Sequence, residues 1–366
     1  MMNDTVDKIE KYADEVLVGA ARYYDQVEEF PEEHVKKLFD LGFFESLYPN
    51  NTVTNYQAYL ANLSNVSHHF PALASIMLTQ ESHALWPFSQ FGTEEQQADY
   101  FNQLLTGQQF GAFALNEEHS GSDYTEMETV ARKVEGGWQL TGAKQYISNA
   151  PVAEVFLIAA RIEQINEEDT YGVFIVRRQV KGFEIGLTEE KMGIKALPVA
   201  SLVLNEVFVA ESALLGGQLN GEQQIRSILN RNRLAVTAQA IGISEGAMKR
   251  ALGYVSRKRN IGKRLIDLQN TQYKLAEIET KLFAANALLN QVVMTNPDDE
   301  RLVAMAKLTA SNDAIETTET IISLVGGYGY MKHNDIERLI RDAKITAIYG
   351  SSSNRLRKII ADPWTK

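Results

Sequence analysis

The spacing of apolar residues changes twice along this chain of 366 residues, and that order constrains the fold more than any single motif. Over the first 111 residues, apolar side chains recur at i, i+3 and i+4, a spacing typical of amphipathic helices. From 112 to 219 the period is two, and the short β-type runs have no helices between them. From 220 the helical period returns. This order predicts an α+β protein with a helical domain at 1–111, a β domain at 112–219 and a bundle at 220–366.

The arrangement within the last two domains follows from the lengths of these segments. Several short strands without crossover helices favour a small antiparallel sheet or barrel. The helical runs that follow have lengths that suit a four-helix bundle, and they lie around 225–256, 269–293, 298–325 and 336–361.

Composition excludes several classes of function. The 36 basic and 47 acidic residues give a net charge of −11, which disfavours nonspecific binding to nucleic acid. The chain contains no cysteine, so disulfides, thiolate metal sites and cysteine nucleophiles are excluded, and its six histidines form no His-x-x-x-His pair. No metal site is expected. The charged N-terminus lacks the apolar core of a signal peptide, and no run resembles a membrane-spanning helix, so a cytoplasmic protein is expected.

Three polar clusters mark the start of the β domain as a candidate binding surface. They lie at 115–117, 120–123 and 142–149, where Gly, Ser, Asn and Asp allow close backbone approach and offer hydrogen bonds. Tyr146 adds a flat ring. Such a surface suits a planar polar ligand, although turns in any β domain use the same residues.

These clusters and two later segments resemble the acyl-CoA dehydrogenase family. Residues 114–123 match its A-x-T-E-x-x-x-G-S-D segment, and 142–149 match G-x-K-x-W-I-T/S-N with Tyr146 in place of tryptophan. Residues 254–269 fit Y-x-x-x-R-x-x-F-G-x-x-L-x-x-x-Q, and the Gly-Gly-Tyr-Gly-Tyr at 326–330 completes the set. The matches are in register along nearly the whole chain.

The resemblance implies an FAD enzyme for an acyl thioester carried on CoA or on an acyl carrier protein. The α proton of the acyl group passes to a carboxylate, and the β hydrogen leaves as hydride to flavin N5. The family also implies a homotetramer or homodimer in which a neighbouring subunit contacts part of the cofactor, and electron transfer to an electron-transfer flavoprotein.

Position by position, the resemblance implies two sets of binding residues. The cofactor would be met by Leu115, Asn116, Tyr146, Ser148, Lys258, Ile261, Gln269, Ser323, Gly327, Ser352 and Asn354. The substrate would be met by Ser122, Arg233 and Tyr349. Lys258 stands where an arginine is usual, so the positive charge persists but bidentate phosphate bonding is lost.

The main departure from the family is the missing catalytic base. Most members carry a glutamate where this chain has Gly350, and a minority place it on a bundle helix where this chain has Asn232. An amide cannot usefully accept a proton at neutral pH. Gly350 would still offer a backbone N–H to the thioester carbonyl. Glu117 and Glu81 are candidate substitutes that the sequence alone cannot place near a substrate.

Two rival functions follow from the missing base. Related flavin monooxygenases use reduced flavin and oxygen and do not need the glutamate. Alternatively, the chain is a binding or partner subunit that keeps the acyl or flavin pocket without turnover. Flavin reduction by an acyl-CoA under anaerobic conditions would distinguish dehydrogenation from both rivals.

Overall fold

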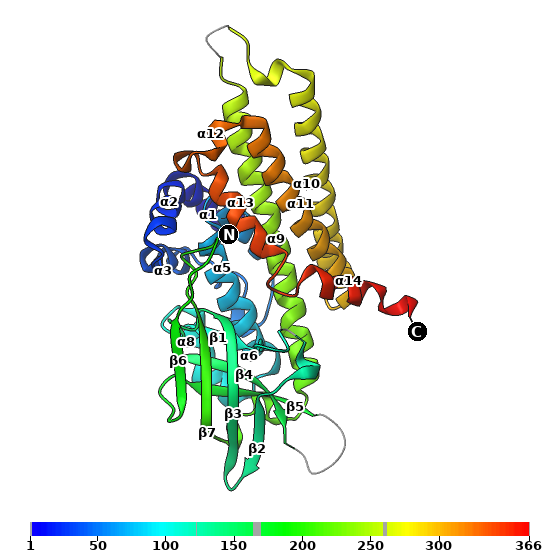
Figure 1. Cartoon of the computed structure of the whole chain (residues 1–366). Helices are drawn as coiled ribbons and strands as arrows, with labels where there is room; N and C mark the ends of the chain where they lie inside the picture. The colour runs from blue at the N-terminus through cyan, green and yellow to red at the C-terminus, as the bar shows by residue number, and fades with distance from the viewer. Residues whose placement is uncertain (1, 122, 164–169, 259–261, 366) are drawn as a thin grey trace.

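The computed structural model describes residues 2–121, 123–163, 170–258 and 262–365. In Figure 1 the curled sheet forms one end of the molecule, the long helices form the other, and the N-terminal helices pack alongside both. This arrangement confirms the α+β class and the expected order of helices, sheet and helices. The domain limits stay a prediction, supported by the change from helix to strand after Leu105 and back to helix at Gly221.

The first part of the chain is helical. Its helices are α1 (Met2–Tyr12), α2 (Val18–Val27), α3 (Glu32–Asp40), α4 (Tyr56–Ser67), α5 (Pro71–Gln80), α6 (Trp86–Phe91), α7 (Glu94–Gln96) and α8 (Asn102–Leu105). A π-helical turn, η3 (Glu81–Leu85), joins α5 to α6. Such turns are frequent at functional sites, because they change the direction of the side chains on a helix.

Among the described residues the sheet has seven strands, and it is more mixed than the sequence predicts. The strands are β1 (Gly111–Ala114), β2 (Val130–Val134), β3 (Gly137–Ser148), β4 (Val155–Ile162), β5 (Tyr171–Arg177), β6 (Phe183–Thr188) and β7 (Val199–Ala210). β1 and β2 both pair parallel with β4, whereas the other pairings are antiparallel.

β1 and β2 both run parallel to β4 because they lie one after the other along the same edge of that strand. β1 pairs with the first half of β4 from Val155, and β2 pairs with its end at Arg161 and Ile162. The chain therefore leaves the edge of β4 after Ala114, makes an excursion over residues 115–129, and returns to the same edge. Two of the three polar clusters lie on this excursion, outside the ladder of the sheet.

Alternating burial on β4 explains how the sheet joins two cores. Val155, Leu157 and Ala159 pack with the helices, while Phe156 and Ile158 point into the curl of the sheet. A strand buried on both faces reads as a continuous apolar run, as β4 does from Val155 to Ala160.

α9 (Gly221–Val255) runs from the sheet to the far end of the bundle (Figure 1). The other helices of this part are α10 (Gln269–Thr295), α11 (Glu300–Val325), α12 (Gly327–Tyr330), α13 (Ile336–Thr346) and α14 (Ser353–Ala361). Gly242 and Gly246 let α4 lie directly on α9, because a Cβ atom there would stand 2.3 and 2.2 Å from the carbonyl oxygens of Ser64 and His68. None of the described helices is long and apolar enough to span a bilayer.

Candidate active site

The loop between α13 and α14 carries the usual base position in a left-handed backbone. Gly350 has φ of 62° and Ser351 has φ of 90°. Two buried cations hold this loop: Lys307 on α11 donates to the Ser351 carbonyl at 2.6 Å, and Arg233 on α9 donates to the Ser351 hydroxyl at 3.0 Å. Burial and the nearby Arg233 lower the pKa of Lys307 to about 7.

The two base positions, Gly350 and Asn232, converge on one point. A Cβ atom on Gly350 would lie 2.7 Å from Asn232 Oδ1 and 3.4 Å from Val236 Cγ2. Asn232 also donates from Nδ2 to the Ser82 hydroxyl at 2.9 Å. The side chain of Asn232 therefore occupies the space that a side chain at 350 would need.

Glu81, one of the candidate substitute bases, is locked in a buried ion pair. Its Oε1 accepts from Arg231 at 2.6 Å and from the Tyr48 hydroxyl at 2.7 Å. The Arg231 guanidinium also lies 3.4 Å from the centre of the Tyr56 ring. With this carboxylate committed to its partners in the interior, Glu81 is not a free proton acceptor.

Glu117, the other candidate substitute, is a structural anchor. It accepts from Lys144 Nζ at 2.7 Å and from the backbone N–H groups of Glu128 and Thr129 at 2.6 and 3.0 Å. Burial opposes its ionisation, but Lys144 and these hydrogen bonds hold its pKa below the usual value. Burial lowers the pKa of Lys144 to about 8. This pair fastens the excursion at 115–129 to β3.

The proposed flavin-end residues gather where that excursion meets β3. Gln145 N donates to the Asn116 carbonyl at 2.8 Å, and Lys144 Nζ donates to the Leu115 carbonyl at 3.2 Å. Tyr146 lies at a bulge in the pairing of β3 with β7, has φ of 56° and is 63% exposed. Ser148 ends the same strand. An exposed aromatic ring at a bulge in the sheet fits a flat ring system.

The residues implied for the other half of the cofactor lie elsewhere on the chain. Those at the end of the bundle away from the sheet are exposed: Lys258, Gln269, Ser323 and Gly327. Figure 1 shows this end of the bundle remote from β3, the strand that carries Tyr146, so one chain does not bring the two halves together. Ile261 lies outside the described residues.

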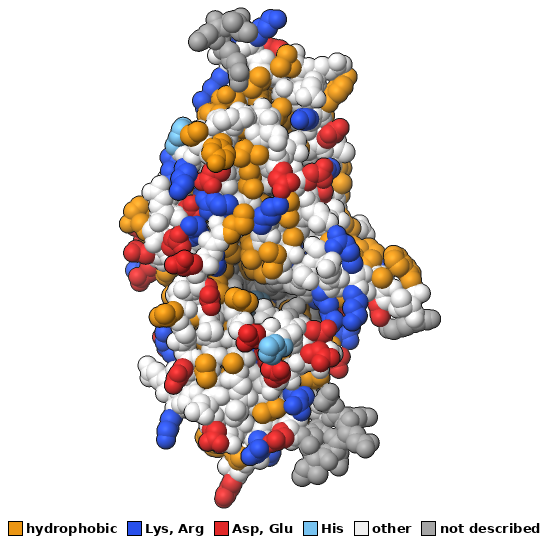
Figure 2. All heavy atoms as spheres, viewed as in Figure 1, with side chains coloured by type: hydrophobic (Ala, Val, Ile, Leu, Met, Phe, Trp, Pro, Cys, Tyr) orange, Lys and Arg blue, Asp and Glu red, His pale blue; other side chains and the backbone are white. Residues whose placement is uncertain are grey.

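Ser352 and Asn354 begin α14, between these two groups. Ser352 caps the helix by accepting from Arg355 N at 3.4 Å, and Asn354 accepts from Arg357 at 3.2 Å. Figure 2 shows Lys and Arg side chains gathered on this face beside the C-terminal helix, and a hollow where the sheet meets the helices.

A cavity of about 380 Å³ reaches the residues that follow both base positions in the sequence. Arg233 and Ser351, which line it, are the chain neighbours of Asn232 and Gly350. Its other walls come from the β domain, α9, α11 and α14, among them Tyr124, Leu229, Glu300 and Arg355. Ser122, expected to meet the substrate, lies outside the described residues.

Tyr349 was also expected to contact the substrate, but unlike Arg233 it is not among the residues that line this cavity. Its hydroxyl donates to Gln239 Oε1 and lies 3.4 Å from the Ser75 hydroxyl. Burial raises the pKa of this phenol above its usual value. The hydroxyl of Tyr349 is thus engaged with α5 and α9, which leaves its ring as the part that could meet a ligand.

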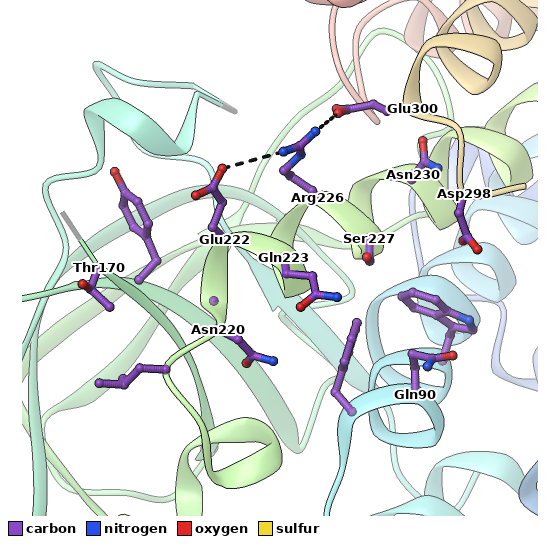
Figure 3. Close-up of a pocket in the computed structure, with 15 residues that line it drawn as sticks. Gln90, Thr170, Asn220, Glu222, Gln223, Arg226, Ser227, Asn230, Asp298 and Glu300 are labelled. Atoms are coloured by element: carbon purple, nitrogen blue, oxygen red, sulfur yellow. Dashed lines mark hydrogen bonds and ion pairs between the residues drawn. The ribbon is translucent and has the colours of Figure 1, made fainter. Parts of the chain in front are cut away.

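A larger cavity of about 810 Å³ is lined in part by the first turns of α9 (Figure 3). Arg226 extends between Glu222 and Glu300, and its ion pair with Glu300 measures 2.9 Å. Glu300 also forms an ion pair with Arg233 at 3.0 Å, and its side chain lines both cavities. Sequence reasoning missed Glu300, Ser82 and Lys307. The polar stripe at 220, 223, 227 and 230 was a signal for the cavity.

Comparisons with known proteins agree with this geometry. Three family models match: acyl-CoA dehydrogenase N-terminal domain at residues 3–108, middle domain at 112–207 and C-terminal domain at 220–363. An acyl-CoA dehydrogenase of Bacillus subtilis is 30% identical over 359 residues, covering 96% of this chain and 95% of that protein. A 3-(aryl)acrylate reductase of Clostridium sporogenes is 32% identical over 361 residues, covering 97% and 93%.

A solved structure extends the likeness to three dimensions. The butyryl-CoA dehydrogenase from Megasphaera elsdenii superposes with a TM-score of 0.93 at 26% identity, covering 100% of this chain and 98% of that one. The match spans the helical parts and the curled sheet alike. The chain therefore belongs to the acyl-CoA dehydrogenase family and is a flavoprotein oxidoreductase of that type.

Proposed function

We propose that this enzyme uses FAD to carry out α,β-dehydrogenation of an acyl thioester, bound on CoA or on a carrier protein. The observation that carries the proposal is the convergence of Gly350 and Asn232 beside the cavity lined by Arg233 and Ser351. The relatives are named for dehydrogenation or reduction of acyl groups, which does not favour a monooxygenase or an inactive binding protein.

The residues of the chain supply binding and orientation for this reaction. Bound FAD would accept the hydride from the β carbon. Tyr146 would lie against its ring system, Leu115 and Asn116 would meet its pyrimidine edge, and Ser148 would donate near N5. The N–H of Gly350 would polarise the thioester carbonyl, which acidifies the α carbon, and the α proton would pass to water because neither base position carries a carboxylate.

The absence of a carboxylate at both base positions favours a second candidate reaction, reduction of an α,β-unsaturated thioester. General-base assistance contributes roughly 10²- to 10⁴-fold to rates, so dehydrogenation without it is slow. In the reductive direction the α carbon gains a proton, which water can supply. The Clostridium sporogenes relative, named an acrylate reductase, supports this candidate.

One pair of titrations tests both reactions. The purified protein is loaded with FAD, and its visible absorbance is followed without oxygen while saturated acyl thioesters are added. The dithionite-reduced protein is then mixed with the matching enoyl thioesters. Bleaching in the first experiment supports dehydrogenation, and recovery of colour in the second supports reduction. A protein that binds FAD and both ligands but performs neither reaction contradicts the proposal, and product formed only with a reductase and oxygen would indicate a monooxygenase.

We further propose that a second copy of the chain completes the cofactor site, in a homodimer or homotetramer. In one chain, the end of the bundle where α9 ends before Lys258 and α10 begins at Gln269 is remote from β3, which carries Tyr146 (Figure 1). Two large apolar side chains on α10, Phe283 and Met294, are 79% and 73% exposed, and such exposure favours a covering partner. Light scattering of the purified protein tests the assembly. An electron-transfer flavoprotein as electron acceptor and a cytoplasmic location stay predictions.

A further inference from the structure

The orientation of the Asn232 amide is fixed by its neighbour Ser82. The Ser82 hydroxyl has one hydrogen, which it donates to the Leu78 carbonyl at 2.7 Å. Its oxygen can then only accept, so the group 2.9 Å away must be the Nδ2 donor of Asn232. The carbonyl oxygen Oδ1 consequently faces the backbone of Gly350, 2.7 Å from the place of a Cβ atom.

Asn232 Oδ1 is an acceptor without a partner in the region where a substrate would react. Asn232 is only 2% exposed, and no described residue donates to its Oδ1. The oxygens of Asn62 and Asn149 are fully enclosed in the interior without a partner, whereas Asn232 Oδ1 is not among these fully enclosed atoms. Leaving a nearly buried acceptor unpaired costs free energy, which a ligand with a suitable donor would recover.

The contacts around this amide are known on two sides. Its Nδ2 donates to the Ser82 hydroxyl, and a Cβ atom on Gly350 would lie between Oδ1 and Val236 Cγ2, at 2.7 and 3.4 Å. A plain alkyl group at this point would meet Val236 but would leave Oδ1 unpaired. The region therefore discriminates by hydrogen bonding close to the reacting carbons.

We propose that the acyl group of the substrate carries a hydroxyl or amino group at or next to its α carbon, and that this group donates to Asn232 Oδ1. The inference rests on the proposed function, because it takes the spot shared by Gly350 and Asn232 as the place of the α carbon. Asn232 acts here as a residue that selects and positions the substrate.

Binding measurements with matched ligands test this inference separately from turnover. The probes are butyryl-, 2-hydroxybutyryl- and 2-aminobutyryl-pantetheine, which keep the thioester and avoid a choice between CoA and a carrier protein. Calorimetry on the FAD-loaded protein gives the Kd of each. One added hydrogen bond to an otherwise unpaired acceptor should tighten binding about five- to tenfold for the hydroxy or the amino ligand. The stronger of the two identifies the donor.

Three variants make the test specific. Asn232→Leu has a similar shape and no acceptor, so it should bind all three ligands within about twofold of one another. Ser82→Ala frees the amide to turn, and it should lose most of the preference. Ser244→Ala is the matched control, because Ser244 is a buried serine on α9 that donates to the carbonyl four residues earlier, at 3.0 Å, away from the loop. It should keep the full preference.

The possible failures point to different steps of the reasoning. Equal binding of the three ligands to the wild type would overturn the inference while leaving the thioester slot intact. If Asn232→Leu still bound the hydroxy or amino ligand more tightly than the butyryl ligand, the donor would bind another acceptor, and the inference would be overturned as well. Binding of none of the ligands, with FAD in place, would contradict the proposed function itself.

Discussion

Restoring a carboxylate to the active site should require two substitutions, because Gly350 and Asn232 compete for one volume. In Gly350→Glu alone, the new Cβ atom meets Asn232 Oδ1 at 2.7 Å, and the backbone keeps φ of 62°. A left-handed conformation costs a residue with a Cβ atom about 1 to 2 kcal/mol. Displacing Asn232 breaks its hydrogen bond with Ser82, which adds about 1 kcal/mol. We expect Gly350→Glu to lose about 2 to 3 kcal/mol of stability and to hold its carboxylate out of position.

The double variant Gly350→Glu/Asn232→Gly removes the collision and keeps the backbone strain at position 350, and the new glycine inside α9 costs up to about 1 kcal/mol of stability. Its rate of flavin reduction by a butyryl thioester should rise about 10²- to 10⁴-fold over the wild type, the range for general-base assistance. Anaerobic stopped-flow absorbance measures this rate. The control Gly350→Ala/Asn232→Gly carries the same strain without a carboxylate and should react as slowly as the wild type.

Two results would refute this reasoning. If Gly350→Glu alone were as fast as the double variant, the two side chains would not share one volume. If the double variant bound flavin and thioester but gained nothing, the missing carboxylate would not be what limits dehydrogenation.

Three further predictions concern stability and the cofactor. Lys144→Met leaves Glu117 buried and unpaired and should cost about 3 to 5 kcal/mol in urea unfolding, whereas Lys133→Met, which breaks an exposed ion pair, should cost at most about 1 kcal/mol. Tyr146→Ala should weaken FAD binding in a fluorescence titration while unfolding of the apoprotein stays within about 0.5 kcal/mol, because the ring is exposed. Native Lys307 releases its proton above about pH 7 while the unfolded chain holds it to about pH 10. Its burial penalty is therefore full below pH 7 and is relieved as pH rises, so the wild type should gain stability relative to Lys307→Met across that window in pH-dependent unfolding.

The architecture could be predicted because side-chain periodicity reports which faces are buried. Apolar spacing separated helices from strands and gave the α+β order, which the structure confirms. The parallel pairing of β1 and β2 with β4 could not be read in this way. Periodicity states that a strand is buried but not which edge it pairs with, and here that edge is interrupted by an excursion of the chain.

The candidate site was predictable in its residue types and not in its contacts. The sequence alone determined that neither Gly350 nor Asn232 can act as a base, because the chemistry of a glycine and an amide does not depend on the fold. Only the tertiary structure shows that Glu81 forms an ion pair with Arg231 and that Glu117 forms one with Lys144.

The contact between Gly350 and Asn232 likewise depends on the tertiary structure. Gly350 and Asn232 are 118 residues apart in the chain, like the directly bonded Arg233 and Ser351, and their competition for one volume depends on how α9 packs against the loop before α14. Composition and motif set which atoms are available for hydrogen bonds and charge. Which of those atoms remain unpaired, and what they face, is fixed only when distant segments pack, because pairing depends on distance in space and not on order along the chain.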